Sequence, residues 1–296
     1  MDSLSLQSTV NAHQVSVNAQ QPTGSDIVST SDSLHSVIVN LAVEDSNKTF
    51  SGLNRAIHAQ ALTWLKKGKP EISALIHKSQ QSPISISEII QPISSPITKS
   101  GNCTTINRVF FKVNFLQGYL LPILLAGIET ERTISLNNHN FNIIGVDTLP
   151  GLGSQAKTTT YQELVDNSKS STAIKLELIT PTSFKHSGCI QPFPLPELVF
   201  NNLLRRWNTF APAEYHFPKI DWQGMTAAYN LKTKVIKKEV IEIGSVGWVR
   251  YVFKNVEQAR VATILANFAN FSGVGRKTAL GMGRISFSQQ LAVNRE

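Results

Sequence analysis

The residues best suited to chemistry form a glycine-rich segment near the end of the chain. It runs from position 273 to 283 and reads GVGRKTALGMG, a spacing of G-x-G-x5-G-x-G. Glycine adopts positive φ and lets the backbone approach a ligand closely, and successive N–H groups beside two cations suit a phosphate. A helix end followed by a tight turn fits the same pattern, so both interpretations stay open. The candidate phosphate-binding residues are Gly273, Gly275, Arg276, Lys277, Gly281 and Gly283.

Two known nucleotide-binding loops differ from this segment. A P-loop requires Gly-Lys-Ser/Thr with another glycine five residues before that glycine, but Arg276 separates Gly275 from Lys277 and position 270 is Asn. A Rossmann loop follows a strand and opens a helix, whereas this segment follows a helical stretch and leads into a strand. The sequence therefore supports neither NTP hydrolysis nor dinucleotide binding.

A second candidate for chemistry is His58, one of seven histidines. It lies at the edge of the apolar stripe of a helix predicted over residues 53–67, and Arg55 projects from the same side. A half-buried imidazole can exchange a proton near neutral pH, while a guanidinium stabilises phosphoryl oxygens. A surface or capping histidine would fit this position as well. No histidine pair has the spacing of a zinc site, so neither a metal nor a cofactor is predicted.

Aromatic and basic residues also alternate on a predicted strand. Gly247-Trp248-Val249-Arg250-Tyr251 is similar to the end of the aromatic strand in RNA-recognition modules, with Trp in place of Phe. Aromatic rings there can stack bases, but a buried Trp and Tyr in an ordinary sheet would give the same pattern. Arg250 and Arg284 complete the set of predicted RNA contacts.

Composition and charge limit the class of protein. With 296 residues, 41% of them apolar and 16% charged, the chain can bury a core, which excludes a fully disordered chain, a collagen or a coiled coil. Residues 1–150 hold 10 Lys and Arg against 10 Asp and Glu, so residues 151–296 carry the whole net charge of +8. Such asymmetry favours a polyanionic partner, although a solvated basic face would also explain it.

The sequence predicts a cytoplasmic protein without a membrane segment. The longest apolar run, 119–128, is interrupted by Pro122 and is shorter than the roughly 18 to 20 residues that cross a bilayer. Residues 1–30 lack the basic and apolar regions of a secretory signal. Two cysteines, Cys103 and Cys189, are too few for a disulfide framework or a structural zinc site.

Periodicity predicts an α+β chain with two tandem ferredoxin-like domains. After a disordered leader over 1–33, the first β-α-β-β-α-β unit occupies 34–150 and carries His58. A polar linker follows over 151–171, and a second unit over 172–290 carries the glycine-rich segment. Its predicted elements are strands at 172–180, 232–243, 247–253 and 282–287 and helices at 195–210 and 256–271.

Together these segments resemble the CRISPR-associated endoribonucleases, CRISPR-associated protein six. The glycine-rich segment matches that family's signature, G-h-G-x5-G-h-G with h apolar, and residues 52–59 resemble the segment that carries its general acid/base histidine. Residues 180–184, followed by 192–194 and by Arg206-Trp207, are similar to the family's entry into its second domain. The resemblance covers residues 34–290.

The resemblance implies an activity, a partner and a role for His58. It implies a metal-independent cut in the repeat of precursor CRISPR RNA, expected to be a hairpin, in which a 2′-hydroxyl attacks the adjacent phosphate and leaves a 2′,3′-cyclic phosphate and a 5′-hydroxyl. His58 would be the general acid or base. The Tyr-His-Lys arrangement of some members is not expected, because the first tyrosine is Tyr119, so Arg55, Lys66 and Lys67 are the candidates for a supporting cation.

Two other functions stay open at this stage. A non-catalytic RNA-binding subunit, with other CRISPR effector subunits as partners, would keep the fold and the glycine-rich segment without turnover. A DNA-binding structural protein would bind DNA of the same sequence equally well.

Overall fold

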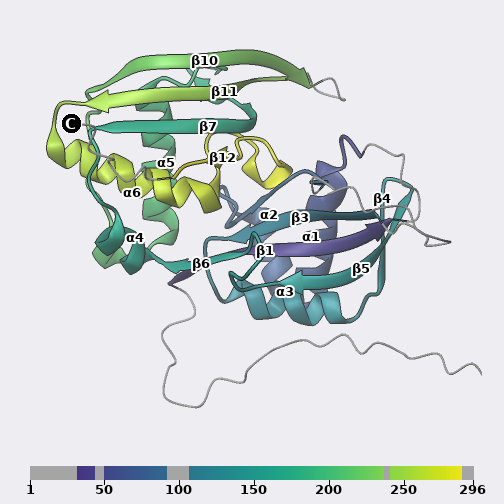
Figure 1. Cartoon of the computed structure of the whole chain (residues 1–296). Helices are drawn as coiled ribbons and strands as arrows, with labels where there is room; N and C mark the ends of the chain where they lie inside the picture. The colour runs from purple at the N-terminus through teal and green to yellow at the C-terminus, as the bar shows by residue number, and fades with distance from the viewer. Residues whose placement is uncertain (1–31, 44–49, 92–106, 237–240, 289–296) are drawn as a thin grey trace, which may run out of the picture.

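The computed structural model describes residues 32–43, 50–91, 107–236 and 241–288. The segment predicted to be a disordered leader lies outside these residues, apart from its last two. Two antiparallel sheets, each with helices on one face, lie one above the other in Figure 1, and the helix α6 runs between them.

The N-terminal half has the predicted β-α-β-β-α-β order with additions. Its sheet runs β2-β3-β1-β5-β4, which is the ferredoxin-like order extended by β4 at one edge. The elements are β1 (Ser33–Val43), α1 (Asn54–Gly68), α2 (Pro70–Lys78), β2 (Ile84–Ile86), β3 (Asn107–Phe115), α3 (Leu120–Glu129), β4 (Thr133–Leu136) and β5 (His139–Asp147).

The packing of α1 against the sheet fixes the position of His58. Alternate residues of β1 and β3 face the helices, and the fully buried Trp64 of α1 stacks on Phe111 with ring centroids 6.2 Å apart. Gly127 allows α3 to approach α1 closely, because a Cβ there would overlap the backbone of Trp64. Contacts with the sheet and with α3 thereby hold α1 in place.

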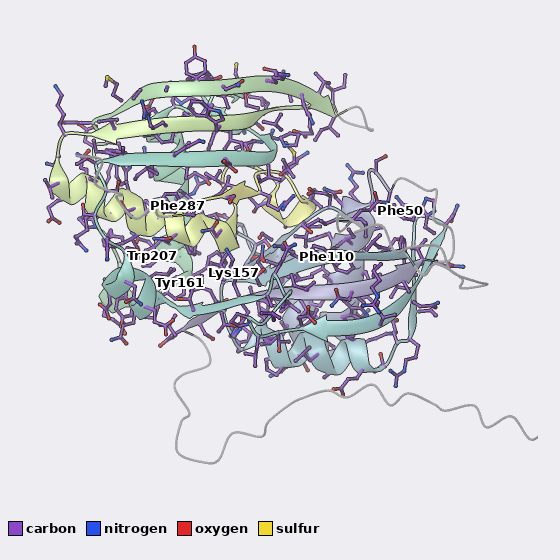
Figure 2. All side chains as sticks on the ribbon, in the orientation of Figure 1. Phe50, Phe110, Lys157, Tyr161, Trp207 and Phe287 are labelled. Carbon is purple, nitrogen blue, oxygen red and sulfur yellow. The ribbon has the colours of Figure 1, made fainter. Side chains whose placement is uncertain are left out.

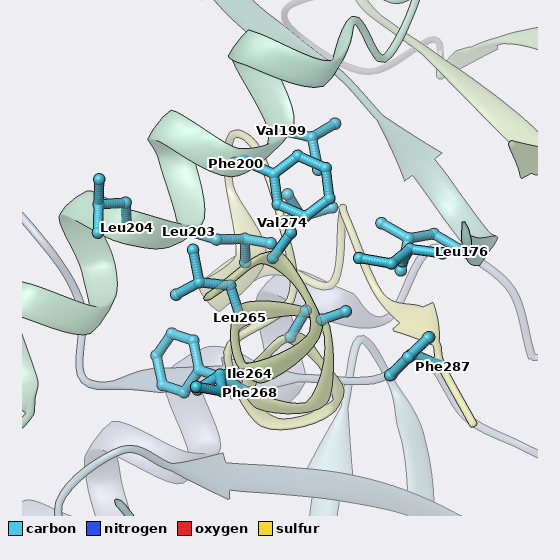
Figure 3. Packing of buried hydrophobic residues seen from close by; sticks show 14 of the residues in the cluster. Leu176, Val199, Phe200, Leu203, Leu204, Ile264, Leu265, Phe268, Val274 and Phe287 are labelled. Atoms are coloured by element: carbon cyan, nitrogen blue, oxygen red, sulfur yellow. The ribbon is translucent and has the colours of Figure 1, made fainter. Parts of the chain in front are cut away.

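The C-terminal half repeats the arrangement. Its sheet runs β10-β11-β7-β12, again the ferredoxin-like order, and α5 and α6 cover one face. Figure 3 shows their packing, with Phe200 and Leu203 of α5 turned toward Leu265 and Phe268 of α6. The elements are β7 (Ala173–Thr182), β8 (Phe184–His186), β9 (Cys189–Gln191), α5 (Pro196–Phe210), η1 (Ala213–Tyr215), β10 (Gly224–Ile236), β11 (Glu242–Phe253), α6 (Val256–Ser272), η2 (Thr278–Leu280) and β12 (Ile285–Ser286). The predicted α+β class with tandem ferredoxin-like folds is confirmed.

The segment predicted to be a linker, 151–171, contains regular structure instead. β6 (Lys157–Thr160) pairs with β1, and α4 (Tyr161–Asn167) follows at once with a capping box between Thr160 and Glu163. Tyr161 is fully buried, its hydroxyl donates to the Leu116 carbonyl oxygen at 2.9 Å, and its ring meets Trp207 edge to face (Figure 2). Polar residues outnumber apolar ones in this segment, so its composition resembles that of a linker although Tyr161, Leu164 and Val165 pack against the core.

The hairpin of the second half was predicted with the wrong turn. The predicted strands were 232–243 and 247–253, but β10 begins at Gly224 and β11 already includes residues 242–246. Gly247, predicted to begin the second strand, sits within β11 at φ +121° beside a register shift, where a Cβ would overlap the Asn230 carbonyl. This glycine therefore allows a strand irregularity. The last strand, predicted over 282–287, is only two residues long.

Candidate functional site

The glycine-rich segment forms a loop between α6 and β12, hereafter the glycine loop (residues 273–283). All four of its signature glycines have positive φ, between +64° and +83°. At each of them a Cβ would overlap another part of the chain, for example the Asn54 side chain at Gly281 and the Val274 carbonyl at Gly283. Val274 is fully buried and points into the core beside Phe200 (Figure 3). The glycines therefore allow the loop to pack tightly against the rest of the chain.

The backbone N–H groups of the four glycines are already engaged within the chain. Gly273 donates to Ala269, Gly275 to the Asn202 side chain at 2.8 Å, Gly281 to Thr278 and Gly283 to Pro181 at 3.1 Å. None of these four glycine N–H groups can therefore reach a phosphate without leaving its present partner. That backbone N–H groups of this loop cradle a phosphate stays a prediction.

The glycine loop contacts the first turn of α1. The side-chain amide of Asn54 donates to the Leu280 carbonyl oxygen at 3.2 Å, and η2 packs on α1. Arg55 is exposed and His58 half-buried, both within the first two turns of that helix. Two segments separated by more than 200 residues, each singled out in the sequence, are therefore adjacent in space.

The two cations of the loop share one carboxylate. Arg276 Nη1 lies 3.0 Å from Glu242 Oε2, and Lys277 pairs with the other oxygen of Glu242 at the start of β11. Burial alone would raise the pKa of the Glu242 carboxyl, but the hydrogen bond from Lys277 and the charge of Arg276 outweigh it and hold the pKa below its usual value. Both predicted phosphate ligands thus already have an ion-pair partner within the chain. The sequence analysis did not identify Glu242 as that partner.

The remaining predicted RNA contacts lie elsewhere. Arg284 pairs with Glu88 of the N-terminal half. Arg250 is exposed on the outer face of the C-terminal sheet, eight residues along β11 from Glu242, or about 26 Å at the rise of a strand. Tyr251 is fully buried and donates to the Pro194 carbonyl oxygen, so it belongs to the core and not to a stacking surface.

Neither lysine at the end of α1 is placed beside His58. Lys67 pairs with Glu131, which also accepts from Trp64 Nε1 at 2.7 Å. Lys66 and Lys67 follow His58 by eight and nine residues, which is about 12 to 14 Å along a helix. Of the three cations considered for a supporting role, only Arg55 shares the first two turns with His58.

A further group of cations, of which the sequence analysis named only Arg284, lies where the two halves meet. Lys112 of β3 is partly buried, and burial together with the charges of Arg284 and Lys157 lowers its pKa to about 8, against an opposing effect of Glu88. The charge of Arg284, which comes from the other half, acts on Lys112 only in the folded chain, so a local pattern does not reveal it.

In the part of the chain that the structure describes, no group of three or more His, Cys, Asp and Glu side chains is arranged to hold a metal ion. No helix among the same residues is both long and apolar enough to cross a membrane.

Comparison with known proteins identifies the family that the chain resembles. Residues 176–285, from β7 to β12, match the family model described as CRISPR-associated endoribonuclease Cas6. The CRISPR-associated endoribonuclease Cas6 of Mycobacterium tuberculosis (strain H37Rv) is 28% identical over 122 residues. That match covers 38% of this chain and 37% of the relative, so little more than a third of the relative is matched.

Solved structures extend the likeness to both halves. A Cas6 product complex has a TM-score of 0.70 at 19% identity, covering 87% of this chain and 100% of its own. Thermus thermophilus Cas6 has a TM-score of 0.64 at 19% identity, with 87% and 99% covered. A Cas6-related protein from Pyrococcus furiosus has a TM-score of 0.55 at 16% identity, again with 87% and 99% covered. At these identities the likeness shows the fold, and the resemblance to Cas6 expected from the sequence is confirmed.

Proposed function

We propose that this chain, which resembles the Cas6 endoribonucleases in the sequence of its C-terminal half and in its whole fold, binds the repeat of precursor CRISPR RNA and cleaves it. The matched family is named for this activity, and two of the similar structures are named as a product complex and a substrate mimic complex. The observation that carries the proposal is the junction between Asn54 and Leu280, which joins the helix of His58 to the glycine loop.

In the proposed reaction the nucleophile belongs to the RNA. The 2′-oxygen forms a bond to the adjacent phosphorus, the bond from phosphorus to the 5′-oxygen breaks, and the products are a 2′,3′-cyclic phosphate and a 5′-hydroxyl. One proton leaves the 2′-hydroxyl and one is delivered to the 5′-oxygen. His58 is suited to one of these transfers, because imidazole is the side chain most often used as a general acid or base.

Cations would stabilise the negative charge that develops on the phosphate. Arg55, one turn before His58 on the same side of α1, is the candidate that this helix supplies. Arg276 and Lys277 could contribute once an RNA phosphate replaces Glu242 as their partner. Because the nucleophile is internal to the RNA, no metal-bound water is required, and we propose that the cut is metal-independent.

Incubation of the protein with repeat RNA in EDTA tests the activity. Discrete fragments ending in a cyclic phosphate are expected, and a single 2′-deoxy nucleotide just 5′ of the scissile phosphate should abolish them. Cleavage of that deoxy substrate would exclude the mechanism. Tight binding without any fragments would instead support a non-catalytic RNA-binding subunit, and equal affinity for DNA of the same sequence would support a DNA-binding protein.

A further inference from the structure

The glycine loop, including Arg276 and Lys277, borders a cleft. Its volume is about 700 Å³, and it lies between α5, residues 79–82 of the N-terminal half and loop residues 275–279. No residue of α1 lines it, so it is distinct from the junction that carries His58. The loop therefore separates two features, with Leu280 against α1 and Thr278 in the cleft.

A buried arginine without a carboxylate partner lines this cleft. Arg206 of α5 is 6% exposed, its Nη1 donates to Thr278 Oγ1 and its Nη2 donates to the Ser82 carbonyl oxygen at 3.1 Å. Its Nε is buried without a hydrogen-bond partner, and among the described residues no carboxylate forms an ion pair with it. A buried charge normally has a counterion, because removal from water costs several kcal/mol.

The rest of the cleft has an excess of positive charge. Lys185 and Arg205 are exposed at its edge, and Glu197 is the one acidic residue among those that line it. Burial lowers the pKa of the Arg206 guanidinium to about 10; the nearby Tyr161 opposes this effect, and the Arg205 charge adds to it.

Amide side chains supply a second kind of contact in the cleft. Gln81 donates through Nε2 to Thr209 at 2.8 Å, while its Oε1 is buried without a partner. Amide groups can read the edges of unpaired bases, and RNA recognition commonly uses single-stranded segments. An anion joined to a hydrogen-bond donor would match both Arg206 and Gln81, and a nucleotide has both.

We propose that this cleft binds one nucleotide of single-stranded RNA beside the cleavage position, with its phosphate at the Arg206 side chain. The identity of the ligand as RNA rests on the proposed function. Thr278 and Leu280 belong to the same short 3-10 segment, so a strand crossing the loop would reach the cleft within a few nucleotides of His58. Lys185 and Arg205 attract the strand from the edge.

A purely structural role for Arg206 predicts different results. One of its two hydrogen bonds, to Ser82, connects the halves and the other anchors the glycine loop, so Arg206→Met would lower stability whether or not RNA binds there. The decisive variant is therefore Lys185→Ala/Arg205→Ala, which removes two exposed charges without touching these bonds. Lys219→Ala/Lys254→Ala removes two exposed charges of the same half outside the cleft and is the matched control.

The experiment measures binding of repeat RNA that carries a 2′-deoxy nucleotide at the cleavage position, in EDTA. A set of such RNAs, each with one methylphosphonate, locates the phosphates that matter. We expect one phosphate other than the scissile one at which a methylphosphonate weakens binding to the wild-type protein about 10-fold. This is the order expected when charged hydrogen bonds are lost. The cleft variant should bind more weakly than the control variant but keep its dependence on that position, because Arg206 is still present, and its slope of log affinity against log salt should fall by about 0.7 per lost contact.

The possible outcomes are distinguishable. Equal behaviour of the cleft and control variants, or the absence of such a position, would overturn the cleft proposal even if the protein cleaves RNA. Cleft-dependent binding without cleavage would overturn only the proposed catalysis. Arg206→Lys adds a further check, because it keeps the charge but loses the forked geometry, and it should weaken binding at the same phosphate position.

Discussion

The side-chain amide of Asn54 donates to the carbonyl oxygen of Leu280 at 3.2 Å. This bond connects the first turn of α1 to the glycine loop, and therefore the N-terminal half to the C-terminal half. Gly281, the next residue, has no room for a Cβ because Asn54 occupies that space. This amide and this glycine thus form the direct contact between the helix of His58 and the loop.

Asn54→Asp removes the amide donor while keeping the shape of the side chain. We expect cleavage of repeat RNA to slow about 10-fold, because the loop is no longer tied to α1, with a loss of roughly 1 kcal/mol in the free energy of unfolding. Single-turnover cleavage and urea unfolding measure the two effects. An unchanged cleavage rate would show that the bond does not position the site.

His58→Ala tests proton transfer. The variant should cleave about 10² to 10⁴-fold more slowly, the usual contribution of a positioned acid or base, while its affinity for uncleavable repeat RNA stays nearly unchanged. Lys67→Ala is the control on the same helix, since Lys67 is paired with Glu131 and lies far along α1. Full-rate cleavage by the His58 variant would remove His58 from the mechanism.

Gly281→Val should damage the protein more than Ala279→Val. Gly281 has φ +79° and its Cβ would meet Asn54, whereas Ala279 lies two residues earlier and lines the cleft. We expect a lower urea midpoint for the glycine variant alone. Similar effects of the two substitutions would mean that the loop tolerates rearrangement at this point.

Glu242→Gln separates the two uses of Arg276 and Lys277. With the carboxylate neutralised, both cations are available, so RNA affinity should rise several-fold and depend more steeply on salt. Arg276→Ala/Lys277→Ala should do the reverse, with the salt slope reduced by about 0.7 to 0.9 per lost contact. If neither variant changes the slope, these side chains serve only the ion pair.

Lys112→Met should stabilise the protein in a pH-dependent way. The pKa of Lys112 is lowered from 10.5 to about 8 in the folded state, so below pH 8 the buried charge is present and its cost is complete. Between pH 8 and 10.5 only the unfolded state keeps the proton, so the wild type gains stability as pH rises. The advantage of the variant in urea unfolding should therefore be larger at pH 7 than at pH 9.5. Lys219→Met controls for an added methionine, and an equal advantage at both pH values would contradict the assignment.

Local patterns were sufficient for much of the fold. The stripe of α1 predicted that helix to within one residue at each end, because Ile57, Ala61 and Trp64 are all fully buried. Patterns failed where a single residue determined the packing. Tyr161 converts a polar stretch into part of the core, and Gly247 marks a strand irregularity that a local pattern does not distinguish from a turn.

The candidate site was predictable in its residue types but not in its partners. The glycines and His58 were found because their types and spacing are unusual. Glu242 lies 34 residues from Arg276, and Asn54 lies 226 residues from Leu280, so nothing local indicates either contact. Arg206 could not be recognised as an unpaired charge until its surroundings were known.

The burial of Tyr161 has a consequence for how the molecule could come apart. Tyr161, Leu34 and Leu116 belong to the same buried cluster as Trp207 and Phe268, so the interior of the C-terminal half is completed by residues outside it. If the chain were divided after residue 150, the first fragment would expose two leucines, and the second would keep Tyr161 but lose the carbonyl to which it is bonded. The fold repeats one arrangement of elements, but the two copies share a buried cluster, so we expect neither copy to fold on its own.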